Sequence, residues 1–126
     1  MKIQLLPDKF TVCQLDAVDL VNLEDDFVFL AKTDEEISLV CPSQSAPSPT
    51  QAEEDGWRGL KIRGAMDFSL IGIISRLTSV LAAEDIPVFV ISTFNTDYFF
   101  VKDEDLSKAL YVLEDEYQTV IDQEDI

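Results

Sequence analysis

Residues 42–56 constrain the fold of this chain more than any other segment, because they hold almost nothing that a protein core could bury. The segment reads PSQSAPSPTQAEEDG, with three of the chain's five prolines, three serines and an acidic patch. This composition is typical of a linker. We therefore expect a β-rich half at residues 1–41, a linker at residues 42–56 and a second domain at residues 57–126. The first part is near the lower limit of ~40–60 residues for independent folding, so we expect it to pack on the second.

The first part has the pattern of strands and turns. Apolar and polar residues alternate from residue 2, residues 6–9 (LPDK) have turn composition, and a second β-rich run follows. This pattern predicts a hairpin over residues 2–15. At most one short helical turn fits between residues 16 and 26. Two further strands are expected, at residues 27–32 and 37–41.

The second part alternates between strand and helix signals. Apolar residues recur at helical spacing over residues 70–84, which predicts a helix with a wide apolar face. Pro87 ends that helix, and the continuous apolar run at residues 86–91 is typical of a buried strand. The other expected elements are strands at residues 57–63 and 98–101, a helix at residues 103–116 capped by Asp103, and a weak strand at residues 119–121. This βαββα order predicts an α+β, ferredoxin-like fold.

A faint internal repeat accompanies this pattern. Residues 29–33 (FLAKT), followed by a few acidic residues and a short apolar run, resemble residues 89–93 (FVIST), followed by a turn and residues 98–101. Such strand-turn-strand patterns are common, so the repeat by itself indicates only two similar hairpins.

The charge of the chain limits its partners. The 126 residues include 25 acidic and 9 basic ones, a formal net charge of -16. Such a charge repels nucleic acid and anionic membrane surfaces and attracts cationic ligands or basic protein surfaces. Residues 103–126 alone hold nine acids and one lysine. They read as a solvated helix face with a tail, or alternatively as a binding surface for a basic partner.

The two cysteines, Cys13 and Cys41, lie far apart and inside apolar runs, which predicts reduced, buried thiols. The N-terminal residues do not form a signal peptide, and no apolar stretch is long enough to span a membrane. We therefore expect a cytoplasmic protein.

The chain contains no histidine, which removes the commonest general base and the usual zinc ligand. No phosphate-binding or dinucleotide-binding glycine motif is present, and the acidic run 103–105 lacks the spacing of a calcium loop. We expect no cofactor, no metal ion and no catalytic residue. An enzyme that uses Asp67 and Asp97 as a carboxylate pair is the weakest alternative.

The junction before the helix at residues 70–84 is one candidate binding site. Free backbone N–H groups and the helix dipole at such a junction can bind a carboxylate, and Gly72 would allow a close approach. A helix capped by Asp67 or Ser69, with Gly72 used for packing, is the simpler interpretation. The candidate residues are Asp67, Phe68, Ser69, Leu70, Ile71 and Gly72.

The link between the strands at residues 86–91 and 98–101 is the second candidate. A turn accounts for Asn95 and Asp97 but less well for the two hydroxyl residues that close an apolar strand. The candidate residues here are Ser92, Thr93, Phe94, Asn95 and Asp97.

This second segment resembles a known family. Residues 91–98 (ISTFNTDY), preceded by the IPVF of residues 86–89, closely resemble the ACT-domain signature of the CASTOR-type arginine sensors and of small bacterial ACT-domain proteins. A looser form of the motif marks the regulatory domains of aspartate kinases. Residues 33–42 (TDEEISLVCP) also resemble the reduced first ACT-like half of these proteins.

The resemblance implies a non-catalytic regulatory module that binds a small amino-acid-like ligand between two ACT domains. It implies that the residues matching Thr93, Phe94 and Asp97 contribute to the ligand pocket, with Asp97 paired to a cationic group. The loop at residues 67–72 would hold the α-carboxylate of the ligand. Because only the second part has the complete βαββα order, we expect a homodimer. A protein that binds a basic partner through its acidic helix, without a small ligand, is the alternative.

Overall fold

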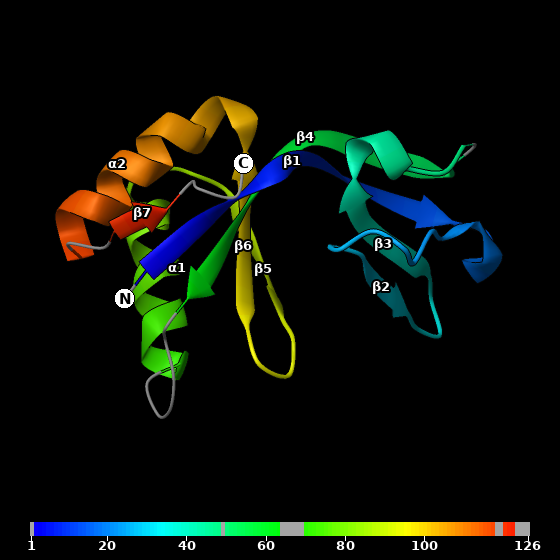
Figure 1. Cartoon of the computed structure of the whole chain (residues 1–126), viewed down its shortest axis with the longest axis horizontal. Helices are drawn as coiled ribbons and strands as arrows, with labels where there is room; N and C mark the ends of the chain where they lie inside the picture. The colour runs from blue at the N-terminus through cyan, green and yellow to red at the C-terminus, as the bar shows by residue number, and fades with distance from the viewer. Residues whose placement is uncertain (1, 49, 64–69, 118–119, 123–126) are drawn as a thin grey trace. The chain divides into compact units, whose positions relative to one another are not determined.

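The computed structural model describes residues 2–48, 50–63, 70–117 and 120–122 (Figure 1). The chain forms two compact units. Unit 2 consists of Asp8–Trp57, and unit 1 combines Met1–Pro7 with Arg58–Ile126. The first seven residues thus belong with the second part of the chain, which differs from the expected division at residues 41 and 57.

The predicted hairpin over residues 2–15 is wrong. These residues form one strand, β1 (Lys2–Leu15), which runs through Pro7 without a turn. Its residues 10–15 pair antiparallel with β3 (Ile37–Pro42), and its residues 2–4 pair in parallel with β7 (Val120–Asp122). Pro7 is exposed, and its fixed φ suits extended backbone. The partners of β1 therefore override the local turn signal.

Unit 2 is a sheet with the strand order β2 (Phe29–Lys32), β3, β1 and β4 (Ala52–Arg63). Its core consists of Cys13, Leu15, Leu39 and Cys41. A single turn of 3-10 helix, η1 (Val18–Leu20), confirms the expected short helical turn, and η2 (Ser43–Ser45) follows β3.

The strand β4 begins inside the predicted linker. Residues 52–55 are one alanine and three acidic residues, all exposed, so nothing in their composition marks them as a strand. They neighbour β1 in the sheet, and Gln51 N–H donates a hydrogen bond to the Gln14 carbonyl oxygen just before β4 begins (3.0 Å). Backbone pairing, which does not depend on hydrophobic side chains, thus extends this strand beyond the apolar run.

Unit 1 has the predicted α+β, ferredoxin-like architecture. Its sheet contains β7, β1, β4, β6 (Asp97–Lys102) and β5 (Val88–Ser92), and the helices are α1 (Leu70–Ala83) and α2 (Leu106–Tyr117). Both helices pack against alternate residues of the strands, which places them on one face of the sheet. The buried core includes Ile3, Leu5, Leu60, Ile62, Leu77, Leu81, Phe99, Val101, Ala109 and Leu113.

The helix α1 confirms the predicted helix and ends before Pro87. Ile86 N–H donates to the Leu81 carbonyl oxygen and Asp85 N–H to that of Ala82, each at 3.0 Å. Asp85 adopts a φ of 60°, in the left-handed region. These features form a Schellman turn, with the buried Ile86 as its hydrophobic contact.

The predicted cap of the second helix is wrong. A 3-10 turn, η4 (Asp103–Asp105), precedes α2, and the capping position before it is Lys102, without a side-chain cap hydrogen bond. The Asp103 carboxylate instead accepts a hydrogen bond from Arg58 Nη1 at 3.2 Å. The opposite charge of Arg58, on the neighbouring strand β4, thus determines where the Asp103 side chain lies.

Candidate functional site

The hairpin of β5 and β6 carries the second candidate segment. Ser92 and Asp97 are the last paired residues of the two strands. Between them, Thr93 N–H donates a hydrogen bond to the Thr96 carbonyl oxygen (2.8 Å), and the Thr93 hydroxyl donates to the same oxygen (3.1 Å). A turn of four residues therefore holds the side chains of Ser92 and Asp97 side by side.

Asp97 is the unusual residue of this hairpin. Its side chain is only 3% exposed, and its Oδ1 accepts a hydrogen bond from the Ser92 hydroxyl. Its Oδ2 is shielded from solvent and has no hydrogen-bond partner among the described residues. A buried carboxylate oxygen without a donor is energetically costly, so it marks a position where a donor is missing.

The tip of the turn is open. The Phe94 side chain is fully exposed (101%), and Asn95 is exposed beside it. The structure therefore brings Ser92 and Asp97 together and presents Phe94 and Asn95 to solvent. An exposed phenylalanine contributes nothing to the core of unit 1.

Tyr98, the residue after Asp97, was not among the candidate residues. Burial raises the pKa of its phenol group, while a hydrogen bond with the Thr96 side chain acts in the opposite direction. The continuous apolar run at residues 98–101 could have indicated its burial, because Tyr98 is the first residue of that run in β6.

The first candidate segment is only partly described. Asp67, Phe68 and Ser69 lie outside the described residues, and Leu70 and Ile71 begin α1. Gly72 is exposed, and no described atom lies within 4 Å of the position that a Cβ would occupy. Among the described residues, none blocks an approach to the backbone at Gly72, and none packs against it as the simpler interpretation required.

The hairpin of β2 and β3 in unit 2 repeats the β5–β6 turn. Lys32 pairs with Ile37 as Ser92 pairs with Asp97, and Thr33 N–H donates to the Glu36 carbonyl oxygen (2.9 Å). The internal repeat seen in the sequence is therefore a structural one. Ile37 stands where the other hairpin has Asp97, so the buried carboxylate belongs to the β5–β6 hairpin alone of these two.

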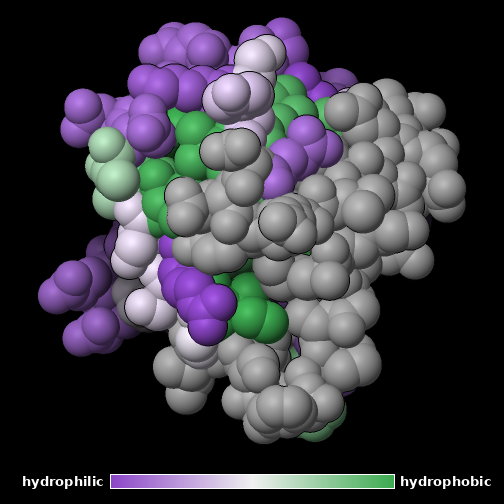
Figure 2. Space-filling model, turned by 90° about the vertical axis from the view of Figure 1, so that its left-hand side faces the viewer, coloured by the Kyte–Doolittle hydropathy of each residue, from purple (hydrophilic) through white to green (hydrophobic). Residues whose placement is uncertain are grey.

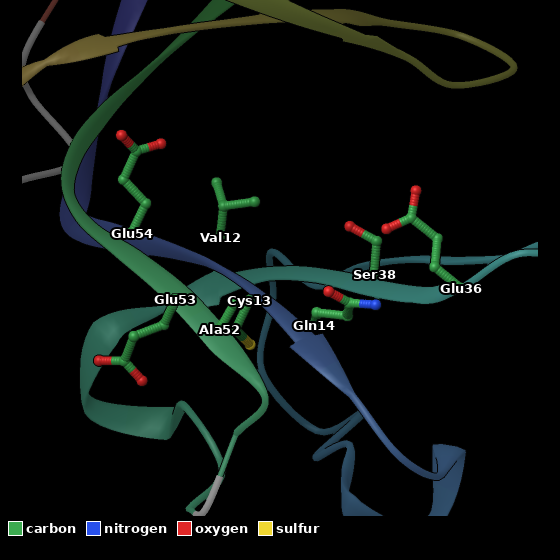
Figure 3. A pocket seen from close by; sticks show the side chains of 8 residues that line it. All are labelled: Val12, Cys13, Gln14, Glu36, Ser38, Ala52, Glu53 and Glu54. Atoms are coloured by element: carbon green, nitrogen blue, oxygen red, sulfur yellow. The ribbon is translucent and has the colours of Figure 1, made fainter.

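A hollow of about 230 Å³ lies in unit 2 (Figure 3). It is open to solvent, and Glu53 and Glu54 extend to opposite sides of β4 (Figure 3). None of the predicted site residues lines it, and its other lining residues are Val12, Cys13, Gln14, Glu36, Ser38 and Ala52. Acidic side chains on an open sheet surface are ordinarily solvated, so we assign this hollow no function.

The two cysteines are free and buried, as predicted. Burial is the main cause that raises the pKa of the Cys41 thiol to about 11, and the nearby Cys13 and Asp25 make smaller contributions. Burial also raises the pKa of Cys13, with smaller contributions from Glu53 and Asp55. Both thiols are therefore protonated near neutral pH, where a protonated thiol is a poor nucleophile.

Two general findings concern the part of the chain that the structure describes. No group of three or more cysteine, aspartate or glutamate side chains is arranged there to hold a metal ion. None of the helices in the same residues is long and apolar enough to cross a membrane. Where coloured in Figure 2, the side of unit 1 that carries the helices is largely hydrophilic, with smaller hydrophobic areas.

The part of the chain that contains the β5–β6 hairpin is similar to known proteins. A family model described as the ACT domain matches residues 52–115. The human protein named cytosolic arginine sensor for mTORC1 subunit 1 is 33% identical over 66 residues, which are 52% of this chain and 20% of that protein. The match thus spans about a fifth of this relative's length.

Solved structures resemble nearly the whole chain. A protein from Agobacterium tumefaciens is 28% identical, with a TM-score of 0.83 over 95% of this chain and 90% of its own. The regulatory subunit of aspartate kinase from Thermus thermophilus shares the fold at 10% identity, with a TM-score of 0.66 over 93% of this chain and 98% of its own.

Proposed function

This chain belongs to the ACT-domain family, and we propose that it is a regulatory module that binds a small amino-acid-like ligand at an interface between two ACT domains. The observation that carries this proposal is Asp97, a buried carboxylate with one oxygen that lacks a donor. An arginine guanidinium or a lysine ammonium group would supply that donor in a charge-assisted hydrogen bond.

The surroundings of Asp97 support a ligand rather than a purely structural role. The equivalent position of the β2–β3 hairpin is Ile37, so the turn itself does not require a carboxylate. The exposed Phe94 lies in the same turn and offers an aromatic face to a ligand there. The open backbone at Gly72 would allow the amino-acid carboxylate to approach the start of α1.

Ligand entry requires a local movement, because Asp97 Oδ2 is shielded from solvent. A ligand that binds the opened form and then reburies the carboxylate would stabilise one arrangement of the domains over others. A partner that reads this arrangement would complete the regulation. Pairing of two complete βαββα units requires a second copy of the chain, so the proposal includes a homodimer.

The test is the thermal unfolding midpoint of the purified protein with each common L-amino acid. At about a hundred times its dissociation constant, a ligand adds ~2.7 kcal/mol, which raises the midpoint by several degrees for a chain of this size. We expect a rise with L-arginine or L-lysine that is absent with L-citrulline, the neutral analogue of arginine.

Variants locate the site. Asp97→Asn keeps an acceptor for Ser92 and should abolish the rise, and Phe94→Ala should reduce it. Tyr111→Ala, a second large side chain that is 72% exposed, is the matched control and should leave the rise unchanged. A rise that persists in Asp97→Asn would exclude Asp97 as the ligand's partner. The absence of any rise with any amino acid would favour the alternative, a protein-binding module without a small ligand.

A further inference from the structure

The segment at residues 16–28 of unit 2 exposes an unusual amount of apolar surface. Of the six large hydrophobic residues that are exposed in the described part of the chain, three lie within residues 18–23. Val18 is 45% exposed, Leu20 41% and Leu23 71%. We call these three side chains the apolar patch. Single exposed aliphatic residues are common, whereas exposed apolar side chains that gather into a patch mark interaction sites.

Other residues of the same segment pack against unit 2 and fix the position of the apolar patch. Val21 and Val28 of the same segment pack against the core of unit 2. The Phe27 ring contacts the Phe10 ring edge-on, with 6.4 Å between their centroids. The segment thus has two sets of apolar residues, one directed into unit 2 and one exposed. Because the packed residues fix the backbone of this segment, binding of a partner to the exposed residues costs little backbone entropy.

All charged residues of the segment that carries the apolar patch are acidic. Residues 16–28 contain five acids, and no lysine or arginine occurs between Lys9 and Lys32. Four of the acids are exposed: Asp16, Asp19, Glu24 and Asp26. A surface that combines exposed aliphatic side chains with carboxylates is complementary to a segment with apolar and basic residues.

The same charge argues against other occupants. A second copy of the patch would bring two sets of carboxylates together, in a chain that already carries a net charge of -16. Nucleic acid and anionic membranes are repelled for the same reason. We propose that the apolar patch is a docking surface for a basic, amphipathic segment of a partner protein, with its aliphatic residues on Val18, Leu20 and Leu23 and its lysines or arginines beside the four carboxylates.

This surface is distinct from the Asp97 site, since it lies on unit 2 and shares no residue with the β5–β6 hairpin. The proposal therefore does not depend on the ligand proposed above. The two can fail separately, because patch variants leave Asp97 intact and Asp97 variants leave the patch intact.

The test uses a defined probe, a short fluorescent peptide. Its leucines recur every three or four residues, so that a helix would carry them on one face and the lysines on the other. A second peptide carries serine in place of each leucine and keeps the same charge. Fluorescence anisotropy measures binding of each to the full-length chain, at low and at physiological ionic strength. We expect the first peptide to bind and the second to bind at least about tenfold more weakly.

Variants assign the binding to the patch. The double substitution Leu20→Ser with Leu23→Ser changes no charge and should weaken binding of the leucine peptide by about tenfold or more. Tyr111→Ser, at a comparably exposed position of α2, is the control and should bind as the unaltered chain does. Circular dichroism and the unfolding midpoint establish that the double variant is folded. NMR shift changes on peptide addition should concentrate at residues 16–28.

Three results would overturn the proposal. One is no binding of the leucine peptide at either ionic strength. Another is equal binding by the double variant and the control, which would show attraction by net charge alone. The third is concentration-dependent self-association in sedimentation that the double variant loses, which would identify a second copy as the occupant.

Discussion

Ser92 and Asp97 face each other at the turn end of the β5–β6 hairpin, and the serine hydroxyl donates the one hydrogen bond that the described residues give to the aspartate side chain. The pair leaves half of a buried carboxylate unsatisfied. The free protein therefore retains an unfavourable interaction at the position where we propose that a ligand binds, as binding sites often do.

Asp97→Asn should stabilise the ligand-free protein. The substitution exchanges a buried charge for a neutral amide and keeps an acceptor for Ser92. Because an unpaired amide costs less to bury than an unpaired charge, we expect a gain of about 1 kcal/mol in the free energy of unfolding, measured by urea denaturation. Ser92→Ala removes the existing donor and should cost about 1–2 kcal/mol. A less stable Asp97→Asn would show instead that the carboxylate is fully paired.

Gly72→Ala should stabilise the protein and weaken ligand binding. Alanine at this exposed position of α1 should add about 0.5–1 kcal/mol to the free energy of unfolding, because glycine loses more backbone entropy in a helix. The new methyl group would also obstruct a ligand at the start of the helix, so the midpoint rise with L-arginine should shrink. Ser79→Ala, at an exposed position further along α1, is the control and should leave that rise unchanged.

Asp85→Gly should stabilise the end of α1. Asp85 has a φ of 60°, which glycine adopts without steric cost, so we expect a gain of up to about 1 kcal/mol in urea unfolding. Asp85→Val should lose at least as much, because a β-branched side chain strains this conformation. Equal stability of the two variants would contradict the left-handed turn.

The stability of the protein should fall as the pH rises from about 9 to about 11. Burial raises the pKa of the Cys41 thiol from its ordinary value of 9.0 to about 11 in the folded chain, so the unfolded state loses its proton first. The stabilisation is complete below pH 9 and disappears as the pH passes through the folded value. Unfolding free energies across this range should show a shallower pH slope in Cys41→Ala than in the unaltered chain. Identical slopes would exclude Cys41 as the source.

Much of unit 1 could be predicted from the sequence. The apolar spacing at residues 70–84 identified α1, and the turn residues at 92–97 identified the β5–β6 hairpin. These signals are local, because helical periodicity and turn composition depend on residues close in sequence. The motif at residues 91–98 likewise identified the ACT family that the comparisons then established.

The errors in unit 2 and at its edges have a common origin. Residues 6–9 resemble a turn, and residues 52–55 resemble a linker, yet both lie within long strands. The deciding interactions are backbone hydrogen bonds to strands far away in the sequence, and these leave little trace in side-chain composition. Asp103 is a similar case, since its partner Arg58 is 45 residues away.

The sequence by itself determined the two helices, the turns between β2 and β3 and between β5 and β6, and the acidic character of this protein, because those depend on local spacing and composition. It also placed Asp97 at the β5–β6 turn, and the resemblance to the ACT family made Asp97 a candidate partner for a cationic group. Only the tertiary structure decided that Asp97 is buried beside Ser92 with an unpaired oxygen, and that Val18, Leu20 and Leu23 are exposed while Val21 and Val28 are packed. Burial is a property of what surrounds a side chain, and those surroundings come from strands and segments that only the folded chain brings together.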